Sequence, residues 1–410
     1  MPTPRRALII GGSLGGLLTA CLLQRDGWRV DIFERVAEEL AGRGASIVTH
    51  PQLLAVLAQC GATVDGTIGV DVPTRITLDA AGRIVGEVAL RQILTSWGRL
   101  YAMLKALFPP EAYHSGFSLA RVEQTADGVR ACFENGAEAH GDLLVGADGI
   151  RSTVRAQFLP AVIPQYAGYV AWRGLVEETA FASATHAELF EKFAFCLPPG
   201  EQMLGYPVAG AGNSTQRGER RYNFVWYRPA AEHSTLVDLL TDETGHRHSV
   251  SIPPPLIRRD VIARMHADAN ALLAPQFAEI VHLQPQPFFQ PIYDVESPQL
   301  AFGRTALVGD AAFVARPHVG MGVTKAGGDA RALADVLRQV DDVPAALREY
   351  ETARLRFGAA VISRARHLGA YMQAQIKTPE ERAMAERYRT PEAVMRETAT
   401  PEDMWDAIPA

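Results

Sequence analysis

The sequence has few cysteines, no dense run of basic residues and no long hydrophobic run. Its four cysteines, Cys21, Cys60, Cys132 and Cys196, lie far apart and form no C-x-x-C pair. This spacing is typical of reduced thiols rather than of a disulfide framework or a zinc motif, so we expect a cytoplasmic protein without a bound metal ion. The formal net charge of −6 leaves no surplus of Lys and Arg to neutralise phosphates. That balance excludes nucleic acid as an expected partner.

The first apolar run, which follows Arg5 and Arg6, is interrupted by glycines and ends at Gln24. A membrane span needs about 20 consecutive apolar residues, and this run is broken well before that length. A secretory signal would keep its apolar core intact up to a cleavage site. We therefore expect neither export nor a membrane as partner, and we interpret the run as a buried strand, a turn and a helix.

What the N-terminal region does contain is the pattern of one strand–helix–strand unit. Residues 7–10 predict a buried parallel strand, 14–24 a helix and 29–34 a second strand. The turn between the first strand and the helix reads GGSLGG, with Gly11, Ser13, Leu14 and Gly16 at the positions that matter for a dinucleotide fingerprint. A serine stands where the second glycine is usual, and its hydroxyl can donate a hydrogen bond to a phosphate.

An acidic residue at the end of the second predicted strand strengthens this interpretation. Glu34 follows Gly11 by 23 positions, where a carboxylate can accept a hydrogen bond from a ribose hydroxyl. The free N–H groups at the start of the predicted helix suit a pyrophosphate. The two features together predict a nucleotide site.

The remaining segments predict two further sheets and a helical end. From Ser118 the turn pairs Asp127-Gly128 and Asn135-Gly136 separate short alternating segments, which indicates an antiparallel meander. Residues 142–148 predict another buried strand. Aromatic stretches in 165–295 predict a separate sheet, residues from 323 onward are mostly helical, and we expect the charged tail after Lys377 to be peripheral.

Four segments in this order resemble the single-component FAD-dependent aromatic hydroxylases. They are the glycine-rich turn with Glu34, RLYAML at 99–104, LLVGADGIRSTVR at 143–155 and GRTALVGDAAFVARPHVGMGVTKAGGDA at 303–330. In the last segment Phe313 stands where many members of the family have histidine. Within the family, GGS in the turn, YAGYVAWRG (166–174), NFVWY (223–227) and GDAAFVARPH (309–318) are most similar to members that hydroxylate dihydroxypyridines.

The resemblance implies an α/β fold class with a Rossmann-like FAD-binding domain of the glutathione-reductase type. It also implies an inserted mixed β-sheet substrate domain and a helical C-terminal segment. The FAD-binding domain would comprise 1–72, 96–164 and 296–330, and the substrate domain 73–95 and 165–295. The C-terminal segment would comprise 331–410.

The resemblance also assigns cofactor-binding residues. Glu34 would hold the adenosine ribose, Asp310 would meet the ribityl hydroxyls, and Asp148 would support the cofactor's surroundings. The full set implied to bind FAD is Gly11, Ser13, Leu14, Gly16, Glu34, Arg35, Arg43, Arg99, Asp148, Asp310, Gly320, Met321, Gly322 and Val323. Of these, Arg43 and Arg99 would lie near the phosphates or the ribityl chain, and 320–323 would present helix N–H groups to the pyrimidine edge of the flavin.

In this family NADH or NADPH reduces FAD, O2 adds to give a flavin hydroperoxide, and one oxygen is transferred to an electron-rich ring. Ionising a ring hydroxyl of pKa about 10 at pH 7 costs roughly 4 kcal/mol, and a positioned base assists this step. His318, beside Pro317, is the candidate for that base or for a hydrogen bond to the substrate. Packing alone is the alternative role for this histidine.

For the substrate pocket we expect Tyr206 and Trp226, with Phe195 behind them, whereas Trp172 and Arg173 are expected to be structural. Only half of a strand's side chains can face one side, and the sequence does not decide which half.

The expected substrate is a hydroxypyridine such as 2,6-dihydroxypyridine. A hydroxybenzoate, a hydroxynicotinate or a larger polyketide aromatic is the alternative, and a flavin-dependent halogenase or a non-catalytic flavoprotein that binds ligands is less favoured. We expect a homodimer.

Overall fold

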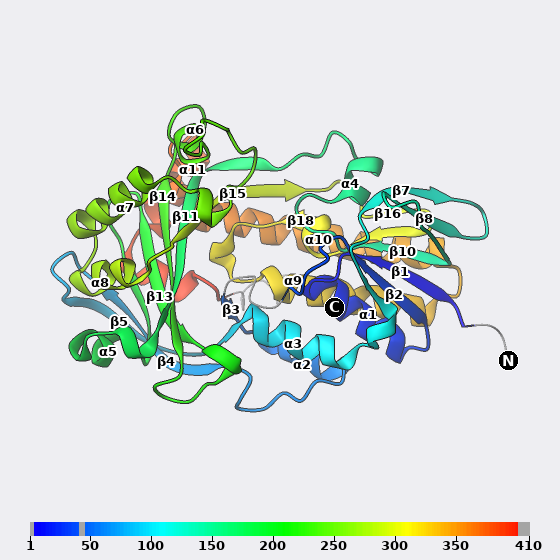
Figure 1. The fold of residues 1–410 in the computed structure, drawn as a ribbon, viewed down its shortest axis with the longest axis horizontal. Helices are drawn as coiled ribbons and strands as arrows, with labels where there is room; N and C mark the ends of the chain where they lie inside the picture. The colour runs from blue at the N-terminus through cyan, green and yellow to red at the C-terminus, as the bar shows by residue number, and fades with distance from the viewer. Residues whose placement is uncertain (1–3, 41–45, 401–410) are drawn as a thin grey trace.

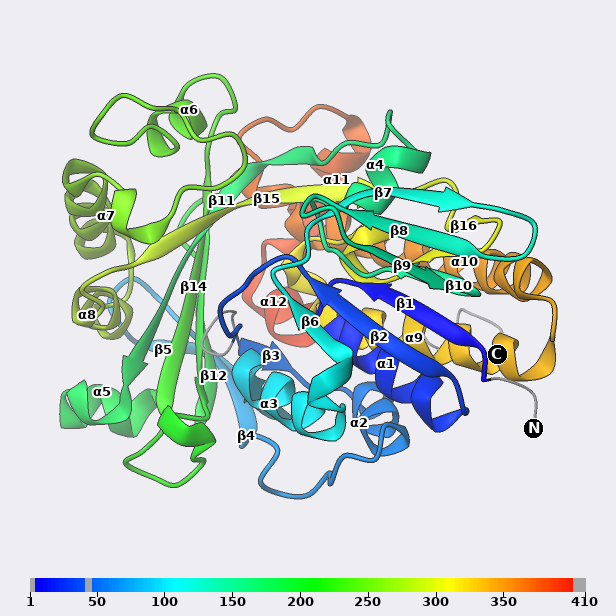
Figure 2. The ribbon, with the colours of Figure 1, turned by 45° about the vertical axis from the view of Figure 1, so that its right-hand side comes forward.

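The computed structural model describes residues 4–40 and 46–400, and its two large sheets lie in two halves of the molecule (Figures 1 and 2). The half on the right of Figure 1 contains the N-terminal strand β1, and the half on the left contains the longer aromatic strands. Within the described residues no helix is both long and apolar enough to cross a membrane.

The first sheet has six strands in the order β16-β17-β10-β1-β2-β6. Four of its five neighbouring pairs are parallel, and only β16 runs antiparallel to its neighbour. The buried apolar residues of β1 explain its central place, because parallel strands are covered on both faces. The strands are β1 (Arg6–Ile10), β2 (Arg29–Glu34), β6 (Tyr113–Ser115), β10 (Leu143–Gly146), β16 (Ala301–Phe302) and β17 (Thr305–Leu307).

Helices α1 (Leu14–Arg25) and α9 (Gly322–Gln339) pack side by side in this half. The predicted strand–helix–strand unit is therefore confirmed, with α1 joining β1 to its parallel neighbour β2. The predicted meander is also confirmed, as a separate antiparallel sheet of β7 (Leu119–Gln124), β8 (Val129–Phe133) and β9 (Glu138–Gly141).

The second large sheet has nine strands in the order β18-β15-β11-β14-β13-β12-β4-β5-β3. It is mixed, because β12 runs parallel to β4 whereas most other neighbours are antiparallel. Its strands are β3 (Ser46–Val48), β4 (Val70–Leu78), β5 (Ile84–Ser96), β11 (Gln165–Glu177), β12 (Lys192–Cys196), β13 (Gln202–Val208), β14 (Arg221–Pro229), β15 (Phe288–Glu296) and β18 (Phe313–Val314).

The two faces of this sheet belong to two different hydrophobic cores. On β14, Val225 and Tyr227 belong to the core shared with the first sheet, whereas Phe224 and Trp226 belong to a second core. This alternation follows from the twofold period of a strand. The second core lies under α5 (Ser183–Leu189), α6 (Thr235–Leu239), α7 (Arg259–Leu272) and α8 (Pro275–Leu283), which flank the left side of Figure 1.

The remaining helices are α2 (Pro51–Gln59), α3 (Trp97–Leu107), α4 (Thr153–Phe158), α10 (Val343–Gly369), α11 (Pro379–Tyr388) and α12 (Pro391–Glu397). The expectation that the tail after Lys377 is peripheral is wrong for its last described part. The fully buried guanidinium of Arg75 donates hydrogen bonds to the carbonyl oxygens of Met395 and Thr398 at 2.6 and 2.7 Å. These contacts hold the end of the chain against the nine-stranded sheet.

Candidate active site

The glycine-rich turn between β1 and α1 has no room for side chains at two of its positions. Gly11 has a φ of +107°, and a Cβ there would lie 2.4 Å from the carbonyl oxygen of Ala147. A Cβ on Gly16 would lie 1.9 Å from the carbonyl oxygen of Gly11. Ser13 is the N-cap of α1, but its side chain makes no capping hydrogen bond. The start of α1 is thus open to an anion, as a helix N-terminus that binds phosphate must be.

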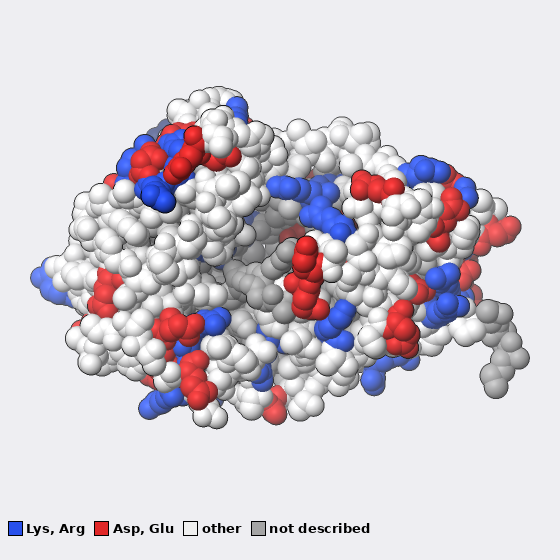
Figure 3. All heavy atoms as spheres, viewed as in Figure 1, with Lys and Arg blue, Asp and Glu red and all other residues white. Residues whose placement is uncertain are grey.

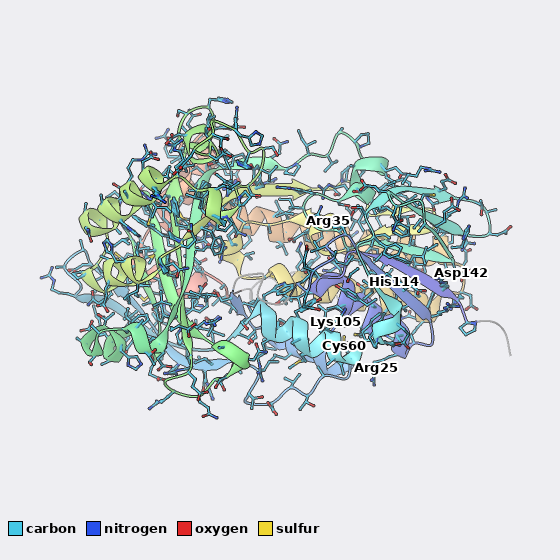
Figure 4. The ribbon with its side chains drawn as sticks, in the orientation of Figure 1. Arg25, Arg35, Cys60, Lys105, His114 and Asp142 are labelled. Carbon is cyan, nitrogen blue, oxygen red and sulfur yellow. The ribbon has the colours of Figure 1, made fainter. Side chains whose placement is uncertain are left out.

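Glu34, at the end of β2, ties this turn to the neighbouring strand. Its carboxylate accepts hydrogen bonds from the N–H groups of Gly12 at 2.8 Å and Val36 at 2.9 Å. The side chain is buried in the protein but lies on the wall of a cavity. Arg35 lies on the same wall, and Figure 4 places it on the side of its half that faces the other half.

One cavity of about 840 Å³ connects the glycine-rich turn with the nine-stranded sheet. Figure 3 shows the surface hollowed between the two halves of the molecule. Its wall includes Gly11, Ser13, Glu34, Asp148, Asp310 and Pro317. The structure therefore brings together the predicted nucleotide turn and the predicted catalytic loop in a space of the size that cofactor sites have.

Asp148 follows β10 and organises the chain around the start of α4. Its carboxylate accepts hydrogen bonds from the hydroxyl of Ser152 and from the N–H groups of Thr153 and Val154. Burial raises the pKa of Asp148, and these donors partly offset that effect. The residue supports one wall of the cavity through the backbone that it holds.

Asp310 follows β17, and its side chain is 52% exposed on the cavity wall. Its Oδ1 accepts a hydrogen bond from Nζ of Lys325 at 2.9 Å. Lys325 comes from the first turns of α9, is only 1% exposed, and also donates to the carbonyl oxygen of Phe313. The sequence analysis missed Lys325, because a lysine in a helix normally indicates a solvent-facing position.

The turn before α9 carries the predicted residues Gly320, Met321, Gly322 and Val323. Gly320 has a φ of +68°, and a Cβ there would lie 2.5 Å from Cβ of Ala399. The N–H group of Ala399 in turn donates to the carbonyl oxygen of His318 at 2.8 Å. Met321 is the N-cap of α9 and makes no side-chain cap, so the first N–H groups of this helix are also open.

Within the described part of the chain, the residues that line the cavity do not include seven of the predicted cofactor residues: Leu14, Gly16, Arg99, Gly320, Met321, Gly322 and Val323. Leu14 is buried as the first residue of α1. Arg99 instead donates hydrogen bonds to the carbonyl oxygen of Asn213 at 3.0 Å and to Oγ1 of Thr67 at 2.8 Å. Arg43 lies outside the described residues.

His318 is packed behind Pro317 rather than exposed to the cavity. The ring is 2% exposed, and its Nε2 is hydrogen-bonded to the hydroxyl of Tyr169 at 2.8 Å. Burial, together with the positive charges of Arg316 and Arg173, lowers the pKa of His318 to about 3. A general base works best with a pKa near the working pH, so this geometry supports a neutral hydrogen-bonding group better than a base.

The predicted pocket aromatics lie on opposite faces of the nine-stranded sheet. Tyr206 and Phe195 belong to the core shared with the first sheet, and the hydroxyl of Tyr206 accepts a hydrogen bond from Ser46 at 2.8 Å. Trp226 belongs to the second core, where its Nε1 donates to Oε2 of Glu201 at 2.7 Å. None of the three is among the residues that line the cavity, and strand alternation turns Trp226 to the opposite face of the sheet.

Arg173 lines the cavity, although the sequence suggested a structural role. Its side chain projects from β11, is 9% exposed, and has a buried Nε without a hydrogen-bond partner among the described residues. No sequence signal could have revealed this placement, because both faces of β11 are buried.

Two family models match parts of the chain. Residues 9–66 match an NAD(P)-binding Rossmann-like domain, and residues 166–294 match an FAD binding domain-like model. The first match covers the glycine-rich turn and Glu34, and the second covers the strand that carries Arg173.

Among curated proteins, 2,6-dihydroxypyridine 3-monooxygenase from Paenarthrobacter nicotinovorans is 33% identical to this chain, covering 91% of it and 92% of the relative. A 3-amino-4-hydroxybenzoate 2-monooxygenase from Streptomyces cremeus is 30% identical, covering 88% and 86% of the two chains. The chain belongs to the FAD-dependent aromatic monooxygenases, so the fold class, cofactor and family implied by the sequence are confirmed.

Solved structures agree with this assignment. The structure of 2,6-dihydroxypyridine-3-hydroxylase from Arthrobacter nicotinovorans matches with a TM-score of 0.85 and 32% identity, covering 93% of this chain and 96% of the other. An FAD complex of a variant of HpxO from Klebsiella pneumoniae matches with a TM-score of 0.74 and 25% identity, covering 98% and 97%.

Proposed function

We propose that this enzyme hydroxylates a hydroxylated pyridine ring such as 2,6-dihydroxypyridine, with NAD(P)H and O2 as co-substrates. The observation that carries the proposal is the single cavity that joins the glycine-rich turn and Asp310 to Pro317 and Arg173. The relative that acts on 2,6-dihydroxypyridine, which matches over 91% of the chain, supports the choice of ring.

The residues on the cavity wall fit FAD. The open N–H groups of α1 suit the pyrophosphate, the carboxylate of Glu34 suits the adenosine ribose, and that of Asp310 suits the ribityl hydroxyls. We also assign the turn at Gly320 to FAD, because the first N–H groups of α9 have no side-chain cap. When bound, FAD supplies the transfer of two electrons from the nicotinamide and the activation of O2.

The protein's own contribution is to bind and orient the ring and to exclude water. Pro317 forms part of the cavity wall, and His318 fixes the loop behind it through its hydrogen bond to Tyr169. The apolar wall residues Ile10, Phe33 and Ile292 exclude water from parts of the cavity, which strengthens charge interactions inside it. In the overall reaction one oxygen atom enters the ring, the other leaves as water, and NAD(P)H provides two electrons.

A hydroxybenzoate is the second candidate substrate, and Arg173 is the specific observation that favours it. A guanidinium without a counter-charge suits a ring carboxylate, because the two groups form paired hydrogen bonds. The 30% identical relative that acts on an aminohydroxybenzoate is consistent with this candidate.

The test is NADH and NADPH oxidation and O2 uptake by the purified protein with each of several rings. The panel is 2,6-dihydroxypyridine, 6-hydroxynicotinate, 4-hydroxybenzoate, 3-amino-4-hydroxybenzoate and urate. We expect strong stimulation by 2,6-dihydroxypyridine and a product heavier by one oxygen atom that derives from labelled O2. Stimulation by a benzoate alone would replace the pyridine by the second candidate, and an FAD that stays oxidised with every ring would refute both.

A further inference from the structure

Arg173 differs from the other buried arginines of the described chain in the partners of its guanidinium. Three of them pair with acids: Arg220 with Glu178, Arg316 with Asp294 and Arg354 with Asp329. Two more, Arg75 and Arg155, donate to backbone carbonyl oxygens. Within residues 4–40 and 46–400, Arg173 alone among these six has neither kind of contact.

The groups around Arg173 are neutral rather than anionic. Burial raises the pKa of Tyr206 and Tyr227 and lowers that of His318, so both tyrosines are protonated and the histidine is uncharged at neutral pH. The positive charge of Arg173 partly offsets the effect of burial on the tyrosines and adds to it on the histidine. The site around the guanidinium therefore offers hydrogen bonds but no negative charge.

A buried cation without a counter-charge is costly, because it loses its hydration and gains no ion pair in return. Such a group is stable in a folded protein when an anion completes its surroundings. Arg173 lines the cavity that the chain presents to small molecules, so the missing anion can enter from that cavity.

The position of Arg173 favours the substrate over the cofactor phosphates as the source of this anion. The open start of α1 follows β1, and Glu34 ends β2, so both features of the proposed nucleotide site lie at the six-stranded sheet. Arg173 belongs to β11 of the nine-stranded sheet, beside β15, whose residues 290–293 also line the cavity.

We propose that Arg173 binds an anionic oxygen of the aromatic substrate and thereby selects rings that carry an ionised hydroxyl or a carboxylate. This inference rests on the proposed function, because it concerns the ring that the enzyme hydroxylates. The planar guanidinium donates two parallel hydrogen bonds, which a lysine cannot reproduce. The bound substrate then supplies the negative charge that the protein does not provide for this guanidinium.

The first experiment measures ring binding without turnover. Oxidised holoenzyme is titrated with benzoate and with benzamide, two rings of the same shape that differ in charge, and binding is followed by the change in flavin absorbance. The variants are Arg173→Met, which keeps a long side chain without its charge, and Arg173→Lys, which keeps the charge without the paired N–H donors of the guanidinium. Arg91→Gln is the matched control, because Arg91 is an exposed arginine of β5 that pairs with Asp71.

We expect the wild-type protein and Arg91→Gln to bind benzoate more tightly than benzamide by about 10- to 100-fold, the range that a hydrogen bond to a charged group provides. Arg173→Met should bind both rings equally, and Arg173→Lys should retain part of the preference. Equal affinities in the wild-type protein, or no binding of either ring, would overturn the proposal. The dissociation constant of FAD should be unchanged in all variants, and a tenfold weakening in Arg173→Met would overturn the proposal by assigning Arg173 to the cofactor.

A second titration distinguishes the two sources of the anion. 4-Nitrophenol is coloured only when ionised, so its absorbance in the bound state reports whether the site stabilises a ring oxyanion. A lowered pKa of bound 4-nitrophenol in the wild-type protein but not in Arg173→Met would assign the guanidinium to ring hydroxyls, whereas a preference for benzoate alone would assign it to carboxylates. Both results support the proposal. A protein that discriminates by charge but does not hydroxylate 2,6-dihydroxypyridine would retain the role of Arg173 and lose the proposed substrate.

Discussion

Replacing Gly16 by alanine should weaken FAD binding strongly, whereas the same replacement at the neighbouring Gly15 should leave FAD binding nearly unchanged. Both glycines lie in the first turn of α1, and both substitutions add one methyl group. The comparison therefore separates the effect of close backbone contact from the general effect of a changed helix residue.

The distances around the two positions determine the expected magnitude. A Cβ on Gly16 would lie 1.9 Å from the carbonyl oxygen of Gly11 and 3.3 Å from Cγ2 of Ile9. The turn would have to open by about 1 Å, and overpacking of this kind typically costs about 1–3 kcal/mol. A Cβ on Gly15 would have Cβ of Ala326 as its nearest neighbour, at an ordinary 3.6 Å. Alanine there should stabilise the helix by up to about 1 kcal/mol.

The assay is thermal unfolding of the apoprotein together with a fluorescence titration of FAD. We expect Gly16→Ala to lower the midpoint by several degrees and to weaken FAD binding at least about tenfold, because the displaced turn carries the open N–H groups of α1. Gly15→Ala should keep its affinity within about twofold. Equal affinities and equal midpoints for the two variants would refute the assignment of this turn as the phosphate site.

Three further predictions follow from buried side chains. Lys325→Met removes the donor to Asp310 and should weaken FAD binding about tenfold in the same titration; an unchanged affinity would separate this ion pair from the cofactor. Burial holds the pKa of His50 at about 4 and that of His318 at about 3, below the usual 6.5, so the unfolded chain takes up protons first and stability falls as the pH drops below 6.5. At pH 5 each histidine should lower the free energy of unfolding by about 2 kcal/mol. Urea unfolding at pH 7 and at pH 5 should therefore show a smaller loss of unfolding free energy for His318→Gln than for the wild-type protein, and identical losses would contradict this. Trp226→Phe should lower stability by about 1–3 kcal/mol because a buried hydrogen bond is lost, yet leave ring affinity unchanged, and a change in affinity without a change in stability would place Trp226 at the site.

The parts of the site that the sequence predicted are those that depend on local spacing. The turn at Gly11 and the acid at Glu34 lie within one strand–helix–strand unit, whose geometry is nearly fixed by its residue types. Asp148 and Asp310 each follow a buried strand of the same sheet, and the carboxyl ends of parallel neighbours meet at one edge. Local patterns therefore place these side chains on the cavity before any long-range contact is known.

The face of each strand in the nine-stranded sheet could not be predicted in the same way. A strand with one wet face shows its orientation by alternating polar and apolar residues. Here β13 is buried at every position and β14 at most of them, so neither strand shows such an alternation. Strand β11 is also buried on both faces, and there Arg173 reaches the cavity, whereas Trp226 of β14 packs in the second core.

The C-terminal segment shows the same limit for contacts between distant parts of the chain. The charged composition of the residues after Lys377 predicted a peripheral tail. Arg75, however, donates hydrogen bonds to the backbone of Met395 and Thr398, more than 300 positions away in the sequence. A fully buried arginine needs acceptors, and here it finds them in carbonyl oxygens that only the folded chain brings to it. The same segment reaches the loop at Pro317 and His318, where the N–H group of Ala399 donates to the carbonyl oxygen of His318 and Ala399 lies next to Gly320. The loop beside the proposed flavin position is thus held in place by the last described residues, which gives this segment a structural role in the enzyme.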